Sequence, residues 1–287
     1  KLVITDINTN DVVYSKYVRH NARQIDTART LLSEVKELLS GKNFKAAVCG
    51  SGGKPVSRAL GIHYIQEVVA NAAAVQRLYP DIRTLGGQDA KVIFFYFDDN
   101  TGRLMTSDMR MNGSCAGGTG AFIDEIATLL GVKTEEFESL AAKGTTVYDI
   151  SGRCGVFAKT DIQPLINEGA TKEDLSASIF QAVVNQTISG LACGKPIRGH
   201  VAFLGGPLHF LSELKTAFIR TLKLDDEHTI VPENSHLFAA IGSALNAKED
   251  VTVSLTELKD RLRHSIKMDF EVERMDPLFA TEEDYEE

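Results

Sequence analysis

The segment KVIFFYFDDNTGRLMTSDMRM, residues 91–111, predicts two β-strands joined by a short turn. Residues 92–98 are mainly aromatic and β-branched, and these are the side chains that strands favour. The Asp-Asn-Thr-Gly sequence at residues 99–102 has the composition of a turn, because such residues tolerate the backbone angles of a tight reversal. Residues 103–111 then form the second predicted strand of a β-hairpin.

The beginning of the chain has the same pattern. Lys1 precedes a predicted strand at residues 2–6, a turn rich in Asn and Asp, and a second predicted strand at residues 12–18. A strand–turn–strand unit followed by helices therefore occurs twice, which indicates a duplicated α/β architecture with a cleft between the halves. The second hairpin follows the loop GGQDA at residues 86–90, so the equivalent loop of the first half would lie before Lys1. The sequence is thus expected to be a piece of a longer protein.

Apolar residues at helical spacing predict helices in both halves. The first helix is expected to begin at an N-cap Asp26 and to end at Gly41, and residues 50–53 are expected to form a flexible turn. The further predicted helices are residues 66–78, 121–130, 135–142 with Thr134 as N-cap, a long helix with Thr171 as N-cap, a helix that ends near Leu222, and residues 238–245.

Composition restricts the possible classes of function. The 287 residues include 31 Lys and Arg against 39 Asp and Glu, so the formal net charge is −8. An acidic chain without a basic stripe argues against a nucleic-acid partner and against an anionic membrane surface. No apolar run approaches the length of a membrane span, and the first residues do not resemble a signal peptide. A cytoplasmic protein with no membrane partner is therefore expected.

The most informative motif is NGSCAGGTG, residues 112–120, directly before a predicted helix. Glycines let backbone N–H groups point toward an anion, and the helix dipole adds partial positive charge there. Cys115 at such a helix start would have a lowered thiol pKa and would exist as a thiolate. The same glycines also suit a plain strand-to-helix turn, and Cys115 alone is equally consistent with a nucleophile or a metal ligand.

Cys154 has the same setting, in SGRCGVFA at residues 151–158 before another helical stretch. Two thiolates at helix starts suit a soft metal or an iron–sulfur cluster, and a symmetric dimer would raise the number of cysteine ligands to four. A buried structural thiol is the alternative for Cys154. Cys49 and Cys193 are expected to be core residues, and the absence of any CxxC pair argues against disulfides in a cytosolic protein.

Two further glycine motifs have the composition of phosphate or nucleotide loops. Gly86-Gly87-Gln88-Asp89 lies between two predicted strands, where backbone N–H groups would bind phosphate and Asp89 would orient Mg²⁺ or water. Gly205-Gly206 follows a buried strand and precedes a helix, which is where α/β folds receive nucleotides. A bare turn is the alternative for each. The chain contains no Walker A sequence, no HExxH motif and no recognisable Ser/His/Asp triad.

The order of the motifs resembles a known family. The sequences GGQDAK (86–91), GSCAGGTGAFIDEIA (113–127), SGRCGVFAKTD (151–161), FLGGP (203–207) and AAIGSAL (239–245) occur in this order. They resemble the ATP-dependent activators of 2-hydroxyacyl-CoA dehydratases and the related subunits of benzoyl-CoA reductase, the BadF/BadG type. The resemblance extends from about residue 1 to residue 245.

The resemblance implies the two-lobed, actin-like α/β fold of acetate kinase, sugar kinases and heat-shock ATPases, with nucleotide in the cleft. Residues 1–85 would be the first lobe, residues 86–250 the second lobe with the cluster cysteines, and residues 251–287 a charged extension or solvated linker. A homodimer would share one 4Fe-4S cluster held by Cys115 and Cys154 of each subunit. Hydrolysis of ATP with Mg²⁺ would drive a low-potential electron into a CoA-ester dehydratase or reductase, with flavodoxin or ferredoxin as the electron donor.

Further site residues are implied by the same resemblance. Gln88 and Asp89 would be catalytic, and the residues that would contact the nucleotide are Gly86, Gly87, Lys91, Gly118, Thr119, Gly120, Gly205 and Gly206.

The sequence departs from the family at three places. The family's first phosphate loop would precede Lys1, the strand before Gly86 is short, and Pro207-Leu208-His209 replaces small and amide residues. The chain as given is therefore expected to hydrolyse ATP poorly. The rival interpretations are a sugar or small-acid kinase of the same fold with structural cysteines, a degenerate nucleotide-binding domain, and a thiol enzyme with Cys115 as nucleophile.

Overall fold

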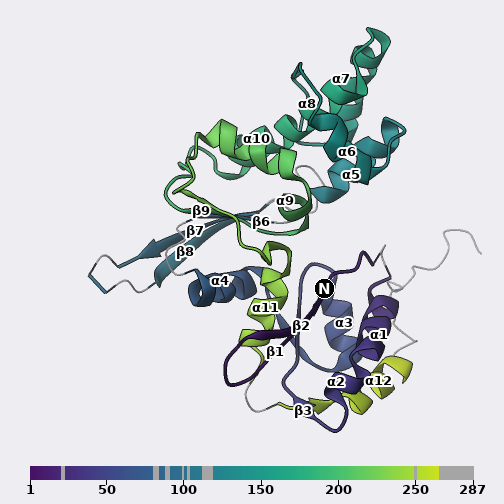
Figure 1. Ribbon diagram of the computed structural model, residues 1–287, viewed down its shortest axis with the longest axis vertical. Coiled ribbons are helices and arrows are strands. Elements are labelled where there is room, and N and C mark those ends of the chain that lie inside the picture. Colours follow the sequence, from purple (N-terminus) through teal and green to yellow (C-terminus); the bar gives the residue numbers. More distant parts are fainter. Residues whose placement is uncertain are drawn as a thin grey trace, which may run out of the picture.

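The structure is a computed structural model that describes residues 1–20, 23–79, 84–87, 91–98, 100–101, 104–111, 119–248 and 251–264. Figure 1 shows a lower part that contains the N-terminus, a β-sheet in the middle, and a group of helices above it. The sheet and the helices above it are called the upper part. Helices α4 and α11 lie between the sheet and the lower part (Figure 1).

The lower part is built from short elements whose strands pair two by two. Among the described residues, β1 pairs with β2 and β3 with β11, both antiparallel, and β4 pairs with β5 in parallel. The elements are β1 (Leu2–Thr5), β2 (Val12–Lys16), α1 (Gln24–Glu34), α2 (Lys36–Leu39), β3 (Asn43–Phe44), β4 (Ala47–Cys49), α3 (Gly53–Leu60), β5 (His63–Ile65), β11 (Val253–Ser254) and α12 (Leu255–His264).

The central sheet contains, among the described residues, five strands in the order β10-β9-β6-β7-β8. Strands β6, β7 and β8 form an antiparallel meander, whereas β9 and β10 continue the sheet in parallel with β6. Because β6 and β9 are parallel, their C-terminal ends lie at the same edge of the sheet. The strands are β6 (Thr84–Gly87), β7 (Lys91–Phe97), β8 (Leu104–Met111), β9 (Val201–Phe203) and β10 (Thr229–Ile230).

Helices cover both faces of this sheet. One face is covered by α4 (Glu67–Leu78) and α11 (Phe238–Leu245). The helices of the upper group are α5 (Gly120–Leu129), α6 (Thr134–Ala141), α7 (Gly155–Asn167), α8 (Lys172–Asn185), the π-helix η1 (Gln186–Leu191), α9 (Gly206–Phe210) and α10 (Ser212–Leu222), and a 3-10 turn, η2 (Ser235–Leu237), precedes α11. None of the described helices has both the length and the apolar character that a membrane crossing requires.

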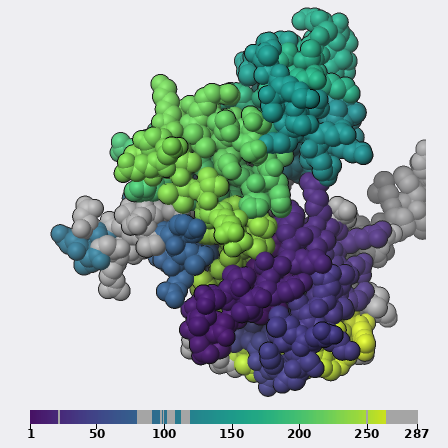
Figure 2. Space-filling view, in the orientation of Figure 1, coloured from purple at the N-terminus to yellow at the C-terminus, as the bar shows by residue number. Residues whose placement is uncertain are grey.

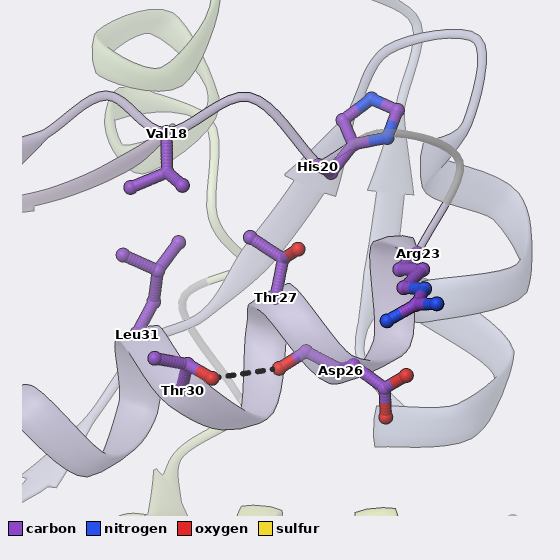
Figure 3. Close-up of a pocket in the computed structure, with 7 residues that line it drawn as sticks. All are labelled: Val18, His20, Arg23, Asp26, Thr27, Thr30 and Leu31. Carbon is purple, nitrogen blue, oxygen red and sulfur yellow. Dashed lines mark hydrogen bonds between the residues drawn. The ribbon is translucent and has the colours of Figure 1, made fainter.

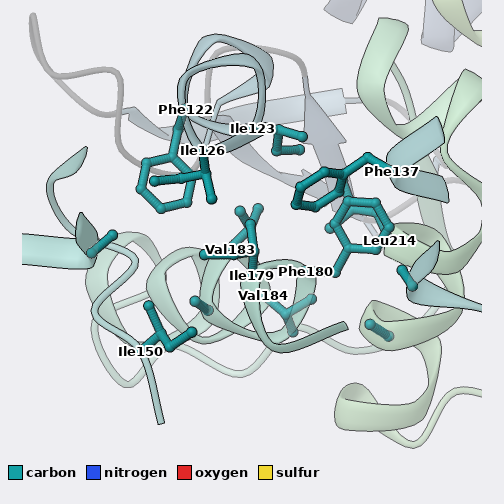
Figure 4. Packing of buried hydrophobic residues seen from close by; sticks show 14 of the residues in the cluster. Phe122, Ile123, Ile126, Phe137, Ile150, Ile179, Phe180, Val183, Val184 and Leu214 are labelled. Atoms are coloured by element: carbon teal, nitrogen blue, oxygen red, sulfur yellow. The ribbon is translucent and has the colours of Figure 1, made fainter. Parts of the chain in front are cut away.

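Alternation along β7 shows why this strand is apolar throughout. Val92 and Phe94 pack against the end of η1, whereas Ile93 and Phe95 pack against α4 and α11. Side chains of a strand alternate between the two faces of its sheet, so a strand covered on both faces needs apolar residues at every position. The largest apolar cluster lies among the upper helices, where Phe122, Phe137 and Phe180 are fully buried (Figure 4).

The two predicted hairpins have the same local construction. Asp6 Oδ1 accepts hydrogen bonds from the backbone N–H groups of Asn8 (2.8 Å) and Thr9 (3.0 Å) in the first hairpin. Asp98 Oδ1 accepts the equivalent bonds from Asn100 (3.0 Å) and Thr101 (2.7 Å) in the second. In both hairpins the strand register also shifts at the residue directly before this aspartate. Local side-chain chemistry therefore makes the same turn twice, as the repeated sequence pattern predicted.

Several predicted helix starts are wrong by a few residues. Helix α1 begins at Gln24, so Asp26 is not its N-cap but lies in the first turn, where it pairs with Arg29 at 3.0 Å. Helix α6 begins at Thr134 itself, whose hydroxyl donates to Asp124 Oδ1 at 2.8 Å rather than capping. Thr171 does cap α8, since its hydroxyl accepts the N–H of Asp174 at 3.1 Å. The Asp26 side chain is thus used by a neighbour in its own helix, and the Thr134 side chain by a residue of another helix.

Two larger corrections concern segments that local composition described poorly. The glycines at residues 50–53 do not form only a flexible turn, because Gly53 begins α3. The segment after residue 250 is not a solvated linker over its described length, since β11 pairs with β3 and α12 buries Leu255, Leu258 and Leu262 against α1 and α3. A short helix with charged residues on one side therefore closes the lower core.

Candidate functional site

The two glycines that precede the second hairpin lie at the edge of the sheet where β6 ends. Gly86 and Gly87 are the last residues of β6, and Gly86 pairs with Phe203 of β9. The chain leaves β9 at the same edge and reaches Gly205 two residues later. The structure thus brings two motifs together that are far apart in the sequence. Gln88 and Asp89, the predicted catalytic residues, lie outside the described residues.

Gly205 opens the turn between β9 and α9 in a conformation that favours glycine. Its φ is +94°, a value that side-chain-bearing residues rarely adopt. Its N–H donates to the carbonyl oxygen of Ser235 at 3.0 Å, and Gly206 begins α9. The strand-to-helix turn at residues 205–206 is therefore shaped by glycine, as the sequence predicted.

A third motif meets this turn. Thr119 caps α5 by accepting the N–H of Phe122 at 3.4 Å. A Cβ placed on Gly120 would lie 3.1 Å from Cγ of Pro207, so the start of α5 is in contact with the turn at residues 205–207. Gly118 and Cys115 lie outside the described residues. The end of β6, the turn after β9 and the start of α5 thus form one region of the upper part. This region, which contains residues 86–87, 119–120 and 205–207, is called the glycine region.

Cys154 lies at the start of α7, as predicted. It is the N-cap residue, its side chain makes no capping hydrogen bond, and it is half-buried. Gly155 packs against the carboxylate of Glu125 on α5, and the same carboxylate pairs with Lys159 at 2.6 Å. Helix α7 therefore begins beside α5, the helix that follows the Cys115 motif.

Apolar side chains are exposed beside Cys154. Val156 is 67% exposed and Phe157 is 61% exposed, although both belong to the first turn of α7. Exposed apolar side chains grouped next to a cysteine are typical of a surface that another protein or group covers.

The other two described cysteines differ from each other. Cys49, at the end of β4, is half-buried and its thiol donates to the carbonyl oxygen of Ala239 at 3.3 Å. Burial raises the pKa of the Cys49 thiol, so it stays protonated and inert. Cys193 was expected in the core, and this is wrong, because it is exposed at the end of η1 with a φ of +48°. Only neighbouring apolar letters suggested burial, and the chain leaves the π-helix there.

Lys91 does not extend freely into the glycine region. Its ammonium pairs with Glu67 Oε2 of α4 at 2.7 Å, and the side chain is only 5% exposed. Glu67 was missed at the level of sequence, because nothing local links the first residue of a helix to the first residue of a later strand. An apolar strand that begins with a lysine was the one available signal that this charge needs a buried partner.

The lower and upper parts touch through an ion pair. Arg19, after β2, places its guanidinium 3.1 Å from each carboxylate oxygen of Asp124 on α5. Hydrogen bonding to Asp124 raises the pKa of Arg19. Figure 2 shows the two parts of the molecule in contact, with the purple N-terminal residues against the upper part.

Aromatic rings form a second contact between the parts. Tyr17 lies 5.1 Å from Phe210 and 5.8 Å from His236, measured between ring centroids. His236 in turn lies 3.9 Å from His209, whose Nδ1 is hydrogen-bonded to Ser235 Oγ at 2.8 Å. His209 and Phe210 lie in α9, directly after the turn at residues 205–206, so the second contact adjoins the glycine region.

His236 is expected to make stability depend on pH. Burial, with smaller contributions from the nearby His209 and Lys1, lowers its pKa to about 4. In the unfolded chain the pKa returns to about 6.5, so between these values the unfolded state binds more protons. The neutral His236 side chain therefore makes its full contribution to the free energy of unfolding above about pH 6.5. This contribution is lost as the pH falls toward 4. Thermal unfolding followed from pH 8 to pH 4 should show a smaller decrease in Tm for His236→Phe than for wild type, and equal decreases would contradict the assignment.

A pocket of about 440 Å³ lies in the lower part at the start of α1 (Figure 3). None of the site residues predicted from sequence lines it. Its walls combine apolar, hydroxyl and charged side chains, namely Val18, His20, Arg23, Asp26, Thr27, Thr30 and Leu31.

The described residues of one chain do not form a metal centre by themselves. No group of three or more His, Cys, Asp or Glu side chains in this part of the chain is arranged to hold a metal ion. Cys154 nevertheless has a position suited to a metal ligand, since it is free, half-buried and at a helix N-terminus. A cysteine-ligated cluster at this position would need ligands from outside the described residues, such as Cys115, or from a second chain.

The chain is similar to characterised proteins in sequence and in structure. A 2-hydroxyisocaproyl-CoA dehydratase activator from Clostridioides difficile is 32% identical over 263 residues, covering 88% of this chain and 92% of that protein. The solved activator of the 2-hydroxyisocaproyl-CoA dehydratase from Clostridium difficile with bound ADPNP has a TM-score of 0.67 and 25% identity, with coverage of 96% of this chain and 94% of that one. Component A of the (R)-2-hydroxyglutaryl-CoA dehydratase from Acidaminococcus fermentans has a TM-score of 0.68 and 25% identity over 83% of this chain and 89% of that one.

These similarities confirm the duplicated, actin-like α/β fold expected from the order of the motifs. The mixed central sheet and the two hairpins of equal construction are consistent with this fold. The sequence pattern of the BadF/BadG/BcrA/BcrD ATPase family matches residues 9–247. Since this match spans most of the sequence, the chain belongs to the BadF/BadG/BcrA/BcrD ATPase family.

Proposed function

We propose that this ATPase delivers a low-potential electron to a CoA-ester dehydratase or reductase, from a 4Fe-4S cluster shared by two subunits. Cys115 and Cys154 of each subunit would hold the cluster, and flavodoxin or ferredoxin would be the electron donor. The names of the similar proteins support a dehydratase as the partner.

The geometry around Cys154 is the observation that carries the proposal. It lies at the N-terminus of α7, where the partial positive charge of the helix end would stabilise the negative charge of a bound cluster. Cys115 precedes Thr119, the cap of α5, by four residues, and α5 packs against the start of α7. Cys154 therefore lies at the start of α7, and the Cys115 motif precedes the neighbouring helix α5 in the sequence, which supports a cluster held by both cysteines.

The exposed apolar residues beside Cys154 favour a dimer at this surface. Val156 and Phe157 would be covered by the partner subunit if the cluster bridged two chains. Their burial would also keep water away from the cluster, and solvent exposure is one of the factors that set the reduction potential of an iron–sulfur centre.

The nucleotide would lie at the region formed by the end of β6, the turn after β9 and the start of α5. Gly86, Gly87, Thr119, Gly120, Gly205 and Gly206 are the described residues that would contact it, with Gln88, Asp89 and Gly118 beside them in the sequence. Backbone N–H groups at glycine turns bind phosphate oxygens, and Mg²⁺ would be held by oxygen ligands such as Asp89. When bound, the cluster would supply one-electron chemistry, and these residues would bind and orient ATP.

The proposal is tested by iron and acid-labile sulfide analysis of the full chain, reconstituted without oxygen. About two iron and two sulfide per subunit in a dimer are expected, since one 4Fe-4S cluster is shared by two chains. No iron after reconstitution would contradict the electron-transfer function and would favour a kinase-like or nucleotide-sensing role for the same fold.

A further inference from the structure

The ion pair between Lys91 and Glu67 is buried. Lys91 Nζ lies 2.7 Å from Glu67 Oε2, and the two side chains are 5% and 13% exposed. A buried ion pair gains little stability over an apolar pair of similar volume, because both charges lose their hydration. Such a pair is better explained by the geometry that it imposes than by the stability that it adds.

Lys91 lies opposite the end of β6, the strand that contains Gly86 and Gly87. It is the first residue of β7, and its backbone pairs in register with Gly87, the last residue of β6. The position of the Lys91 backbone is therefore coupled directly to Gly87 and Gly86, which lie at the proposed phosphate site. A side chain that holds Lys91 also holds the end of β6.

Glu67 occupies a rigid position. It is the first residue of α4, one turn before Ala70 on the same helix. Ala70 is fully buried, and its carbonyl oxygen is in such close contact with Gly242 of α11 that a Cβ on Gly242 would overlap it. The carboxylate of Glu67 is thus attached to the crossing of α4 and α11, between the sheet and the lower part (Figure 1).

Glu67, Lys1 and Lys91 all act electrostatically on the Cys49 thiol, so these groups lie near one another. Burial raises the pKa of the Cys49 thiol, so it stays neutral. The ammonium of Lys91 therefore interacts with a carboxylate of its own chain at the α4–α11 crossing, on the side of β7 away from solvent.

We propose that Glu67 is a positioning residue, which holds Lys91 and thereby sets the position of Gly86 and Gly87 for binding of the nucleotide phosphates. Lys91 is then a tether between β7 and α4 rather than a ligand of the phosphates. This inference rests on the proposed nucleotide site, and it does not depend on the iron–sulfur cluster.

A double-mutant cycle on the full chain tests the tether, with the Kd of Mg·ADP measured by calorimetry as the readout. Glu67→Gln and Lys91→Met are each expected to weaken binding roughly tenfold, because either substitution removes the same tether. The double variant Glu67→Gln/Lys91→Met, in which no buried charge is left unpaired, is expected to bind within about threefold of the single variants. If Glu67 and Lys91 had independent roles, the fold-loss in affinity of the double variant would be the product of the two single losses.

Two controls separate positioning from general destabilisation. Phe137→Leu loosens the packing between α6 and α8 without touching the glycine region, so it should lower Tm and leave the Kd unchanged. Lys16→Met removes an ion pair with an equal N–O distance of 2.7 Å, between Lys16 and Glu34, that is exposed in the lower part. It should change neither quantity by much.

Each contrary outcome identifies which part fails. If Lys91→Met weakens binding while Glu67→Gln does not, Lys91 acts directly on phosphate and the tether is overturned. If both variants lower Tm and keep the wild-type Kd, the pair is only structural and the tether is again overturned. If the wild-type chain does not bind Mg·ADP, the proposed nucleotide site and the tether fail together, whereas the iron analysis tests the cluster separately.

Discussion

A chain that carries Cys154→Ser is expected to contain no iron–sulfur cluster after anaerobic reconstitution. The hydroxyl of serine is a harder and far less acidic ligand than a thiolate, so a cluster that prefers four thiolates would lose two of them, one from each subunit. Iron should decrease from about two atoms per subunit to nearly none, with loss of the visible absorbance of the cluster. Cys115→Ser is expected to have the same effect.

Cys193→Ser is the matched control, because Cys193 is exposed at the end of η1 and lies outside both glycine–cysteine motifs. It should retain the iron and sulfide content of the wild type. Full iron in the Cys154 variant would contradict the shared cluster.

The cluster would also join the two subunits, so chelation of the iron should lower the molecular mass measured in solution. A dimer that keeps its mass after chelation would contradict this second expectation.

Gly242→Val is expected to have the largest effect on folding. Helices α4 and α11 cross with the backbone of Ala70 against Gly242, and any Cβ at residue 242 would overlap the Ala70 carbonyl oxygen. Backbone atoms in the middle of two packed helices cannot rotate away, so the helices must separate and the cluster of Ala74, Val75, Phe238 and Ile241 must loosen. We expect a loss of about 3 kcal/mol, at the upper end of the usual cost of overpacking.

Chemical denaturation of the variant and of a matched glycine substitution would measure this effect. A Cβ at Gly52 would meet Gln24 Nε2 at 3.2 Å, which is the end of a flexible side chain that can move away. Gly52→Ala should therefore cost well under 1 kcal/mol. A wild-type unfolding midpoint for Gly242→Val would show that α4 and α11 are not in close contact.

The parts of the fold that were predicted correctly are those that depend on neighbouring residues. The Asp6 and Asp98 turns, the Thr171 cap and the helix at Phe238–Leu245 all follow from side chains within a few residues of the feature. The Thr134 cap failed because Asp124, on another helix, accepts the Thr134 hydroxyl. Asp124 also accepts the Arg19 guanidinium, and Arg19 is 105 residues away in the sequence.

The candidate site residues that were predicted from sequence also depend on their neighbours, whereas the one that was missed depends on a distant partner. The glycines at 86–87, 120 and 205–206 could be selected from sequence because each lies between a strand and its next element. Cys154 could be selected because a glycine follows it at a helix start. Glu67 could not, because its role exists only once α4 is placed against β7.

The sequence by itself determined the two hairpins, the glycine turn at residues 205–206, the position of Cys154 at a helix start and, through the order of the motifs, the ATPase family. All of these rest on short-range conformational preferences. Only the tertiary structure decided which of them meet. The contact of Gly120 with Pro207, the Lys91–Glu67 pair and the burial of α12 depend on the packing of apolar surfaces from distant segments. Hydrophobic burial is non-directional, so residue type alone does not specify its partners.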